Sequence, residues 1–210
     1  MAADRDGELV AVASLASSPA IGKAVPFTGA AAGAIAVQGY TSPYLGVAGM
    51  KMLREGAGAA EMIQRILEGD PLRESRQILA LDSQGQTAGH TGTSLAPYAG
   101  AICGQGYIVG GCGLGAENVL NRCADAYEEA SGSLAERLLA VMEVPGRDEG
   151  GPGRIISAVL RISGKLPYPW IDLRIDRHAR PLDELRALFA EWDARHGSIC
   201  SEQENGAGHC

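Results

Sequence analysis

The segment GAIAVQGYTSPYLG, residues 33–46, contains the change of periodicity that decides the fold class. In its first half Ile35, Val37 and Gly39 fall on one parity, which is typical of a β-strand. Its second half begins with Ser42-Pro43, and a hydroxyl side chain followed by proline is typical of a helix start. A strand therefore passes into a helix here, and the chain belongs to a mixed class.

Outside this segment, runs of strands alternate with pairs of helices. Strands are predicted over residues 8–16, 21–27, 29–40, 76–81, 86–90, 106–109, 155–162 and 170–176. Helices are predicted after Ser42, over 59–67, over 117–130, after the Ser133/Glu136 capping box and over 182–192. This order predicts an α+β fold in which two largely antiparallel sheets pack face to face with helices outside.

The composition is that of an ordinary globular protein. Of the 210 residues, 46% are hydrophobic and 20% are charged, which suffices for a sizeable core without disulfide bonds. We expect one domain over residues 1–196. Residues 197–210 are polar and lack periodicity, so we expect a disordered tail there.

Charge and hydropathy exclude several kinds of partner. The net charge is −7 and Lys and Arg do not cluster, so no nucleic-acid partner is expected. No run of 18 apolar residues is present, so no membrane span is expected. The start of the chain, residues 1–6, is too polar for a signal peptide. The five cysteines are odd in number and contain no Cys-x-x-Cys pair, which indicates reduced thiols and a cytoplasmic protein.

No cofactor or metal site is expected. The glycine-rich segment 104–115 lacks the Gly-Lys-Ser/Thr of a phosphate-binding loop, so tight turns are the simpler interpretation. Asp172 and Asp176 alternate with Arg174 on one strand face, where the guanidinium would neutralise the carboxylates. The His and Cys residues of the tail match no zinc spacing.

Cys112 lies in the glycine-rich segment, and His90 is the histidine in the middle of the chain. A thiol nucleophile requires a base and an electropositive setting, so this pair is one candidate for catalysis. The alternative is that Cys112 is a small buried thiol.

Residues 33–46 also resemble the Gln-x-Tyr-Thr-Asn-Pro-x-Tyr-Gly segment of the domain-of-unknown-function 1028 family, which is grouped with the Ntn (N-terminal nucleophile) hydrolases. Further matching segments follow in the family's order: 53–56, 60–61, 76–77, 82–85, 90–92, 99–100, 104–107 and 171–176. The resemblance extends from about Ala3 to Trp192. It implies a four-layer αββα sandwich, in agreement with the predicted order of elements.

The resemblance also implies a chemistry. In Ntn hydrolases the first residue of the mature chain is Thr, Ser or Cys, whose side chain attacks an amide carbonyl while its own α-amine acts as the base. This chain enters the family pattern after the first strand, so the usual N-terminal Thr is absent and no Ser, Thr or Cys precedes Ser14. Polar family positions are also replaced at Leu15, Ala101, Cys112 and Ile156.

Three hypotheses follow. The first is a small-molecule amide or other C–N hydrolase whose nucleophile is encoded upstream of Met1. The second is a catalytically inactive binding or structural module on the same fold. The third is a hydrolase that uses Cys112 with His90 as its base. The residues expected to line a ligand cleft are Ser14, Gln38, Tyr40, Thr41, His90, Thr91, Tyr98 and Cys112. Paired sheets with outer helices also suit self-association, so we expect a homo-oligomer.

Overall fold

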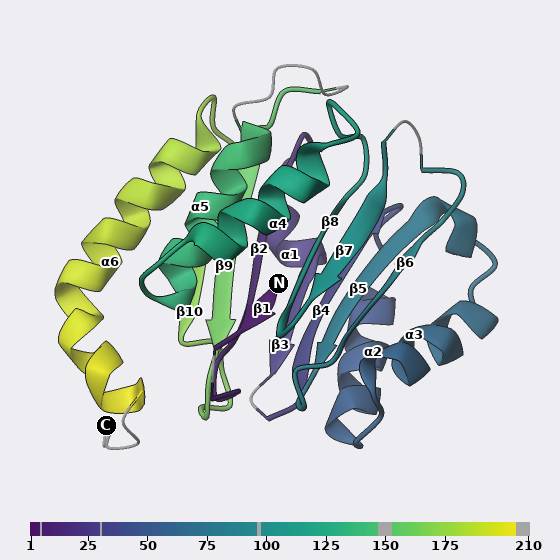
Figure 1. Cartoon of the computed structure of the whole chain (residues 1–210), viewed down its shortest axis with the longest axis horizontal. Helices are drawn as coiled ribbons and strands as arrows, with labels where there is room; N and C mark the ends of the chain where they lie inside the picture. Colours follow the sequence, from purple (N-terminus) through teal and green to yellow (C-terminus); the bar gives the residue numbers. More distant parts are fainter. Residues whose placement is uncertain (5, 30, 96–97, 147–152, 205–210) are drawn as a thin grey trace.

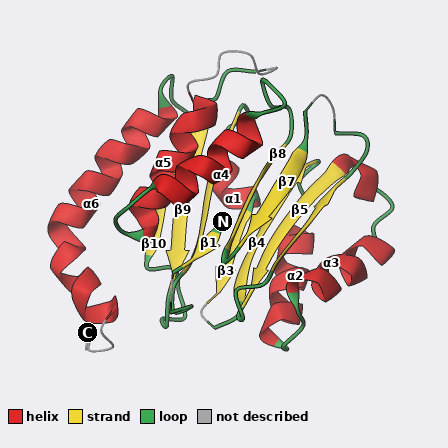
Figure 2. Ribbon diagram, viewed as in Figure 1, coloured by secondary structure: helices red, strands yellow, loops and turns green. Residues whose placement is uncertain are grey.

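The computed structural model describes residues 1–204 except 5, 30, 96–97 and 147–152, and residues 205–210 lie outside the described part. Its elements form four layers: helices, a sheet, a second sheet and helices again (Figures 1 and 2). The predicted αββα sandwich is therefore confirmed.

The first sheet, sheet A, has six strands in the order β10-β9-β2-β1-β8-β7, and all neighbouring strands are antiparallel. Its strands are β1 (Ala2–Ala3), β2 (Val10–Ala16), β7 (Gly100–Gly104), β8 (Tyr107–Gly111), β9 (Ser157–Ser163) and β10 (Ile171–Ile175). The very short strand β1 lies at the centre of this sheet, between β2 and β8.

The second sheet, sheet B, has the order β3-β4-β5-β6 and is also antiparallel. Its strands are β3 (Pro26–Gly29), β4 (Gly33–Gly39), β5 (Arg76–Asp82) and β6 (Thr87–Thr91). The predicted hairpin between β5 and β6 is confirmed. Asp82 stabilises its turn, because its Oδ1 accepts the backbone N–H groups of Gln84 and Gln86.

The helices are α1 (Ile21–Ala24), α2 (Pro43–Arg54), α3 (Ala59–Glu68), α4 (Val119–Glu129), α5 (Leu134–Gly146) and α6 (Pro181–Glu204), with a 3₁₀ turn at Arg73–Ser75. Helices α2 and α3 cover sheet B, and α4, α5 and α6 cover sheet A (Figure 1). The predicted capping box at the start of α5 is confirmed, since Ser133 and Glu136 exchange side chain to backbone hydrogen bonds.

Three apolar cores hold the layers together. The core between the two sheets contains Val12, Leu79, Ile108 and Val159, each buried. A second core lies between sheet A and its helices, and a third lies between sheet B and its helices. Alternate residues of the central strands contribute to different cores, as the two-residue period of a strand requires.

Helix α2 approaches sheet B closely because it has glycines on its inner face. A Cβ at Gly46 would lie 2.2 Å from the ring of Phe27, and a Cβ at Gly49 would lie 2.5 Å from Ile35 Cδ1. Glycine is therefore required at these two helical positions despite its cost in helix propensity.

Several elements differ from the sequence prediction, and strands β1 and β7 lie outside the predicted strands. The predicted strand over 21–27 is instead the short helix α1 followed by β3, which begins at Pro26. Ile21 and Val25 are spaced by four residues, as on one face of a helix, and both enter the inter-sheet core. A short apolar run fits a single helical turn as well as a strand, so the sequence pattern could not distinguish the two. The disordered tail expected over 197–210 is wrong for residues 197–204, which belong to α6, and residues 205–210 lie outside the described part.

Candidate functional site

The centre of sheet A contains an unfilled strand position, which we call the slot. Strand β1 pairs Ala2 with Ala11 of β2 and with Tyr107 of β8, and the chain starts one residue earlier at Met1. Both flanking strands continue beyond this point, to Ala16 and Gly111. No strand of the described part of the chain lies between these two extensions.

The pairing register gives the size of the slot. Because Ala2 lies opposite Ala11, Met1 lies opposite Val12, and four further residues in line with β1 would face Ala13 to Ala16. In an antiparallel pair the backbone groups of alternate residues face the partner strand. The N–H and C=O groups of Ala13 and Leu15 on β2, and of Gly110 on β8, therefore face the slot.

The α-amine of Met1 lies at the inner end of the slot. It donates a hydrogen bond to Ile108 O at 2.9 Å, and Ile108 N donates to Met1 O at the same distance. Desolvation by complete burial lowers the pKa of this amine from 8.0 to about 5. An ordinary peptide N–H at this position would make the same hydrogen bond without the cost of burying a charge.

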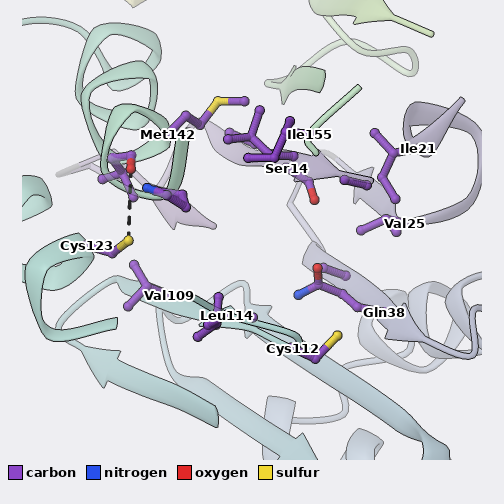
Figure 3. A pocket seen from close by; sticks show the side chains of 18 of the residues that line it. Ser14, Ile21, Val25, Gln38, Val109, Cys112, Leu114, Cys123, Met142 and Ile155 are labelled. Atoms are coloured by element: carbon purple, nitrogen blue, oxygen red, sulfur yellow. Dashed lines mark hydrogen bonds between the residues drawn. The ribbon is translucent and has the colours of Figure 1, made fainter. Parts of the chain in front are cut away.

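The slot is continuous with a cleft of about 1160 Å³ that opens between the two sheets. Its walls are the ends of β2, β4 and β8 together with α1, α4 and α5. Figure 3 shows Ser14, Gln38 and Cys112 directed into this space, with apolar side chains such as Leu114 and Ile155 around them. Ser14 Oγ, the Gln38 carboxamide and the Cys112 thiol are thus polar groups directed into a cavity that apolar side chains also line, as is usual for a small-molecule site.

A buried glutamine connects the cleft to both sheets. Gln77 of β5 is 0% exposed, and its Nε2 lies 2.8 Å from Gly100 O, 3.1 Å from Gly111 O and 2.9 Å from Thr91 Oγ1. Its Oε1 accepts a hydrogen bond of 3.1 Å from Gln38 Nε2. The polar side chain of Gln38 in the cleft is therefore anchored through Gln77.

Cys112 is half-buried at the cleft wall, directly after β8. Burial raises the pKa of its thiol, although a hydrogen bond with the backbone of Gly39 partly opposes the effect. A thiol with a raised pKa is a poor nucleophile at neutral pH. Cys103 and Cys112 are not joined in disulfide bonds within the described part of the chain.

The structure brings together only part of the predicted site. Ser14, Gln38, Thr41 and Cys112 line the cleft. Thr91 lies behind it, where its hydroxyl contacts Gln77. Tyr40 and Tyr98 are 66% and 50% exposed and are not among the residues that line the cleft.

His90 and Cys112 do not form a pair. His90 lies opposite Ile78 in the β5–β6 register, so it faces α3 on the outer side of sheet B. Its Nε2 lies 3.0 Å from Arg73 O. Since Cys112 faces the opposite side of sheet B, His90 is not placed to accept its proton.

Charged residues surround one end of the cleft. Arg186 pairs with Glu143, Arg180 pairs with Asp183, and the Arg154 guanidinium donates to Ala179 O at 2.9 Å. Within the described residues no group of three or more His, Cys, Asp or Glu side chains is arranged to hold a metal ion. On the charged face of β10, Asp172 is paired with Arg174, as the alternation of charges predicted, and also with Arg161 of the neighbouring strand β9.

One feature of the site was missed from the sequence. Gln77 precedes the apolar run of β5, and this isolated amide at a buried strand position was a usable signal. The slot agrees with the expectation that the chain enters the family pattern after its first strand, but its place in the sheet depends on the pairing of Met1 with Ile108 far along the chain.

Comparison with known proteins agrees with this fold. The model of a family of unknown function, DUF1028, matches residues 1–185. The chain belongs to the DUF1028 family. Its fold is similar to the crystal structure of another DUF1028 protein, SPO2555 from Silicibacter pomeroyi, with a TM-score of 0.84 and 25% sequence identity. The match covers 91% of this chain and 87% of that one. No curated protein matches this DUF1028 chain. In the described residues no helix combines the length and apolarity needed to cross a membrane.

Proposed function

We propose that the cleft is the active site of a cytoplasmic Ntn-type hydrolase that cleaves an amide or other C–N bond of a small molecule. The nucleophile would be the first residue of a segment that precedes Met1 and fills the slot. The observation that carries this proposal is the central strand β1, which stops at the cleft with its amine buried.

The register supports a specific position for the nucleophile. Four residues ahead of Met1 would place the first of them opposite Ala16 and beside Cys112. Met1 packs in the inter-sheet core, so by strand alternation the fourth residue before it would also face the space between the sheets. That is the side on which Ser14 and Gln38 lie.

A threonine at this position would have both groups that the reaction requires. Its Oγ would attack the carbonyl carbon while its α-amine takes the hydroxyl proton. The C–N bond would then break, and the protonated amine would return its proton to the leaving nitrogen. Water would cleave the resulting ester and restore the hydroxyl, which balances the reaction as hydrolysis.

Met1 itself does not supply this chemistry. Its side chain has no nucleophile, and its amine is bonded to Ile108 O within the sheet. This observation favours the second candidate, a binding module without catalysis, for the chain that begins at Met1. The raised pKa of Cys112 and its separation from His90 argue against an internal thiol mechanism.

The experiment compares three proteins. The first begins at Met1, the second has Thr-Val-Ser-Val joined ahead of Met1, and the third has Val-Val-Ser-Val as the matched control. The valines at the second and fourth positions would face the apolar core beneath α4 and α5. Release of ammonia or amine from a panel of primary and secondary amides is the readout, and intact mass confirms each N-terminus.

We expect turnover only by the protein with N-terminal threonine. Equal activity of the threonine and valine forms, or no activity of either on the whole panel, would reject the hydrolase proposal. Ligand binding by a form without turnover would instead support the binding module.

We also propose that the protein self-associates through the exposed apolar surface at the start of α2. Tyr44 and Val47 are 85% and 63% exposed there, and Tyr40 is close in sequence. Light scattering measures the mass of the particle in solution, which should fall in Tyr44→Glu relative to the parent protein. Tyr168→Glu, at an exposed tyrosine elsewhere, is the control and should leave the mass unchanged. The same mass in Tyr44→Glu as in the parent would contradict the proposal.

A further inference from the structure

The orientation of the Gln77 carboxamide is determined by its neighbours. Two backbone carbonyl oxygens, Gly100 O and Gly111 O, lie within 3.1 Å of its Nε2. Carbonyl oxygens accept hydrogen bonds and cannot donate them, so the NH₂ group of Gln77 must face them. Reversing the amide would place oxygen against oxygen in a site that water does not reach.

The orientation of Gln77 determines that of Gln38. With its NH₂ group directed at the two carbonyls, Gln77 presents only its oxygen to Gln38. Gln38 must therefore donate, and its NH₂ group lies 3.1 Å from that oxygen. The acceptor of the carboxamide, Gln38 Oε1, is then turned away from Gln77. Figure 3 shows the Gln38 oxygen on the side where Ser14 lies, within the cleft.

We propose that Gln38 Oε1 is a fixed acceptor that recognises an N–H group of the ligand, and that Gln77 is the positioning residue that fixes it. The ligand class is therefore a molecule with a primary or secondary amide, or an amine, at the point where it meets Gln38. The identification of this cleft as the ligand site rests on the proposed function.

Selectivity follows from the lack of freedom at Gln38. A free glutamine can rotate its amide and offer either a donor or an acceptor. Here, rotation would break the bond to Gln77 and leave a buried oxygen without a donor. A ligand group that lies against Oε1 must therefore carry a hydrogen, and a group that has only acceptors is disfavoured at that position. The Ser14 hydroxyl can donate or accept and does not discriminate in this way.

The test uses two probes that differ in one N–H group. N-Methylacetamide has an amide hydrogen and N,N-dimethylacetamide has none, while their carbonyl groups match. Both are titrated into ¹⁵N-labelled protein that begins at Met1, and the Gln38 side-chain NH₂ and the Gly110 backbone amide are followed by NMR. We expect N-methylacetamide to bind about tenfold more tightly, as one hydrogen bond of ordinary net strength predicts.

Three variants identify the residues responsible. Gln38→Met removes the acceptor at a half-buried position and should make the two affinities equal. Gln77→Met leaves Gln38 in place but frees it to rotate, so the preference should fall to within about twofold. Its Gln38 NH₂ hydrogens should also exchange with solvent faster than in the parent. Gln64→Met, which removes an exposed glutamine of α3 bonded to Glu68, should change neither quantity.

Equal affinity of the parent for the two probes would overturn the proposal, as would a preference that survives Gln38→Met. If Gln77→Met does not fold, slow exchange of the Gln38 NH₂ hydrogens in the parent still tests the anchoring, and rapid exchange refutes it. The outcome is separable from the proposed function. Discrimination without hydrolysis by the threonine form rejects only the hydrolase, and hydrolysis without discrimination rejects only the role of Gln38.

Discussion

At the scale of single residues, the α-amine of Met1 is a polar group that folding buries, and burial costs it the hydration of its charge. Other backbone nitrogens of sheet A are uncharged, whereas this one is an amine buried beside Ile108. Desolvation is the cause of its lowered pKa, so no neighbouring charge offsets the loss of water.

The stability of the form that begins at Met1 should therefore rise with pH between about 5 and 8. The pKa of this amine is about 5 in the folded protein and 8.0 when it is exposed to solvent, so in this window the unfolded chain binds more protons than the folded one. This difference corresponds to at most about 4 kcal/mol of unfolding free energy, which is absent at pH 5 and fully present by pH 8.

Urea unfolding at several pH values measures how the unfolding free energy changes with pH. A form acetylated at Met1 is the control, because its difference from the free form isolates the amine from other titrating groups. An identical slope in both forms would contradict the prediction.

A second residue-scale prediction concerns the buried pair of Asp70 and Arg76. Arg76 donates to both Asp70 oxygens and to Tyr40 O, and the side chains of both partners are less than 10% exposed. The side-chain hydrogen bond from Arg76 keeps the Asp70 pKa below its usual value. Asp70→Asn should cost about 3–5 kcal/mol of unfolding free energy, because it leaves the guanidinium buried without its counter-charge.

The matched control for this pair is Asp183→Asn, which removes the carboxylate of the exposed Arg180–Asp183 pair. We expect a loss below about 1 kcal/mol there, since solvent screens exposed pairs. Similar losses in the two variants, measured by chemical denaturation, would show that burial is not what makes the Asp70–Arg76 pair important.

At the scale of elements, the slot predicts that strand β1 lengthens when residues are joined ahead of Met1. The Thr-Val-Ser-Val form should have a higher Tm than the form that begins at Met1. Hydrogen exchange should slow at Ala13 and Leu15, whose amides face the slot, and stay unchanged at Val12 and Ser14, whose amides face β9.

The control extension is Thr-Pro-Ser-Pro. Its prolines fall at the two positions that would pair with Ala13 and Leu15, and proline has no N–H to donate to them. This form should show no rise in Tm and no slowing of hydrogen exchange at Ala13 and Leu15. Protection at Ala13 and Leu15 with the proline extension would mean that the added residues do not pair as a strand.

The packing of α2 on sheet B gives another element-scale prediction. Gly49→Ala would place a Cβ 2.5 Å from Ile35 Cδ1 and should destabilise the protein by about 1–3 kcal/mol. Gly69→Ala is the control. This residue ends α3 with φ −96° and has no atom within 4 Å of an added Cβ. Its substitution should be neutral or mildly stabilising by denaturant titration.

At the scale of the whole molecule, the two sheets should unfold together. They share one apolar core, and Gln77 of sheet B donates directly to Gly100 and Gly111 of sheet A. Fluorescence of Trp170 and Trp192, which pack against each other at α6, should therefore report the same midpoint as far-ultraviolet circular dichroism. Two separate transitions would show that residues 1–196 do not behave as one domain.

Much of the fold could be predicted from the sequence because it rests on local patterns. The Asp82 turn, the capping box at Ser133 and the alternation over 171–175 each act within a few residues, and the structure contains all three. Strand β7 was missed, because Gly100–Gly104 has no apolar periodicity of its own. Its position comes from pairing with β8.

The candidate site could be predicted only in part, for a related reason. Ser14, Gln38, Thr41 and Cys112 were selected from segments at strand ends, and the fold does gather them in one cleft. His90 was selected in the same way but faces α3, because its register opposite Ile78 directs it outward. A change of one position in register reverses the face of a strand residue, and the sequence around His90 carries no sign of that register.

By itself the sequence determined the α+β class, the order of most strands and helices and the family, since periodicity and turn residues act over short distances. Only the tertiary structure decided the slot, the buried amine and the fixed carboxamide of Gln38. Each depends on hydrogen bonds between distant residues, Met1 with Ile108 and Gln77 with Gly111, and such pairings arise when the sheets assemble.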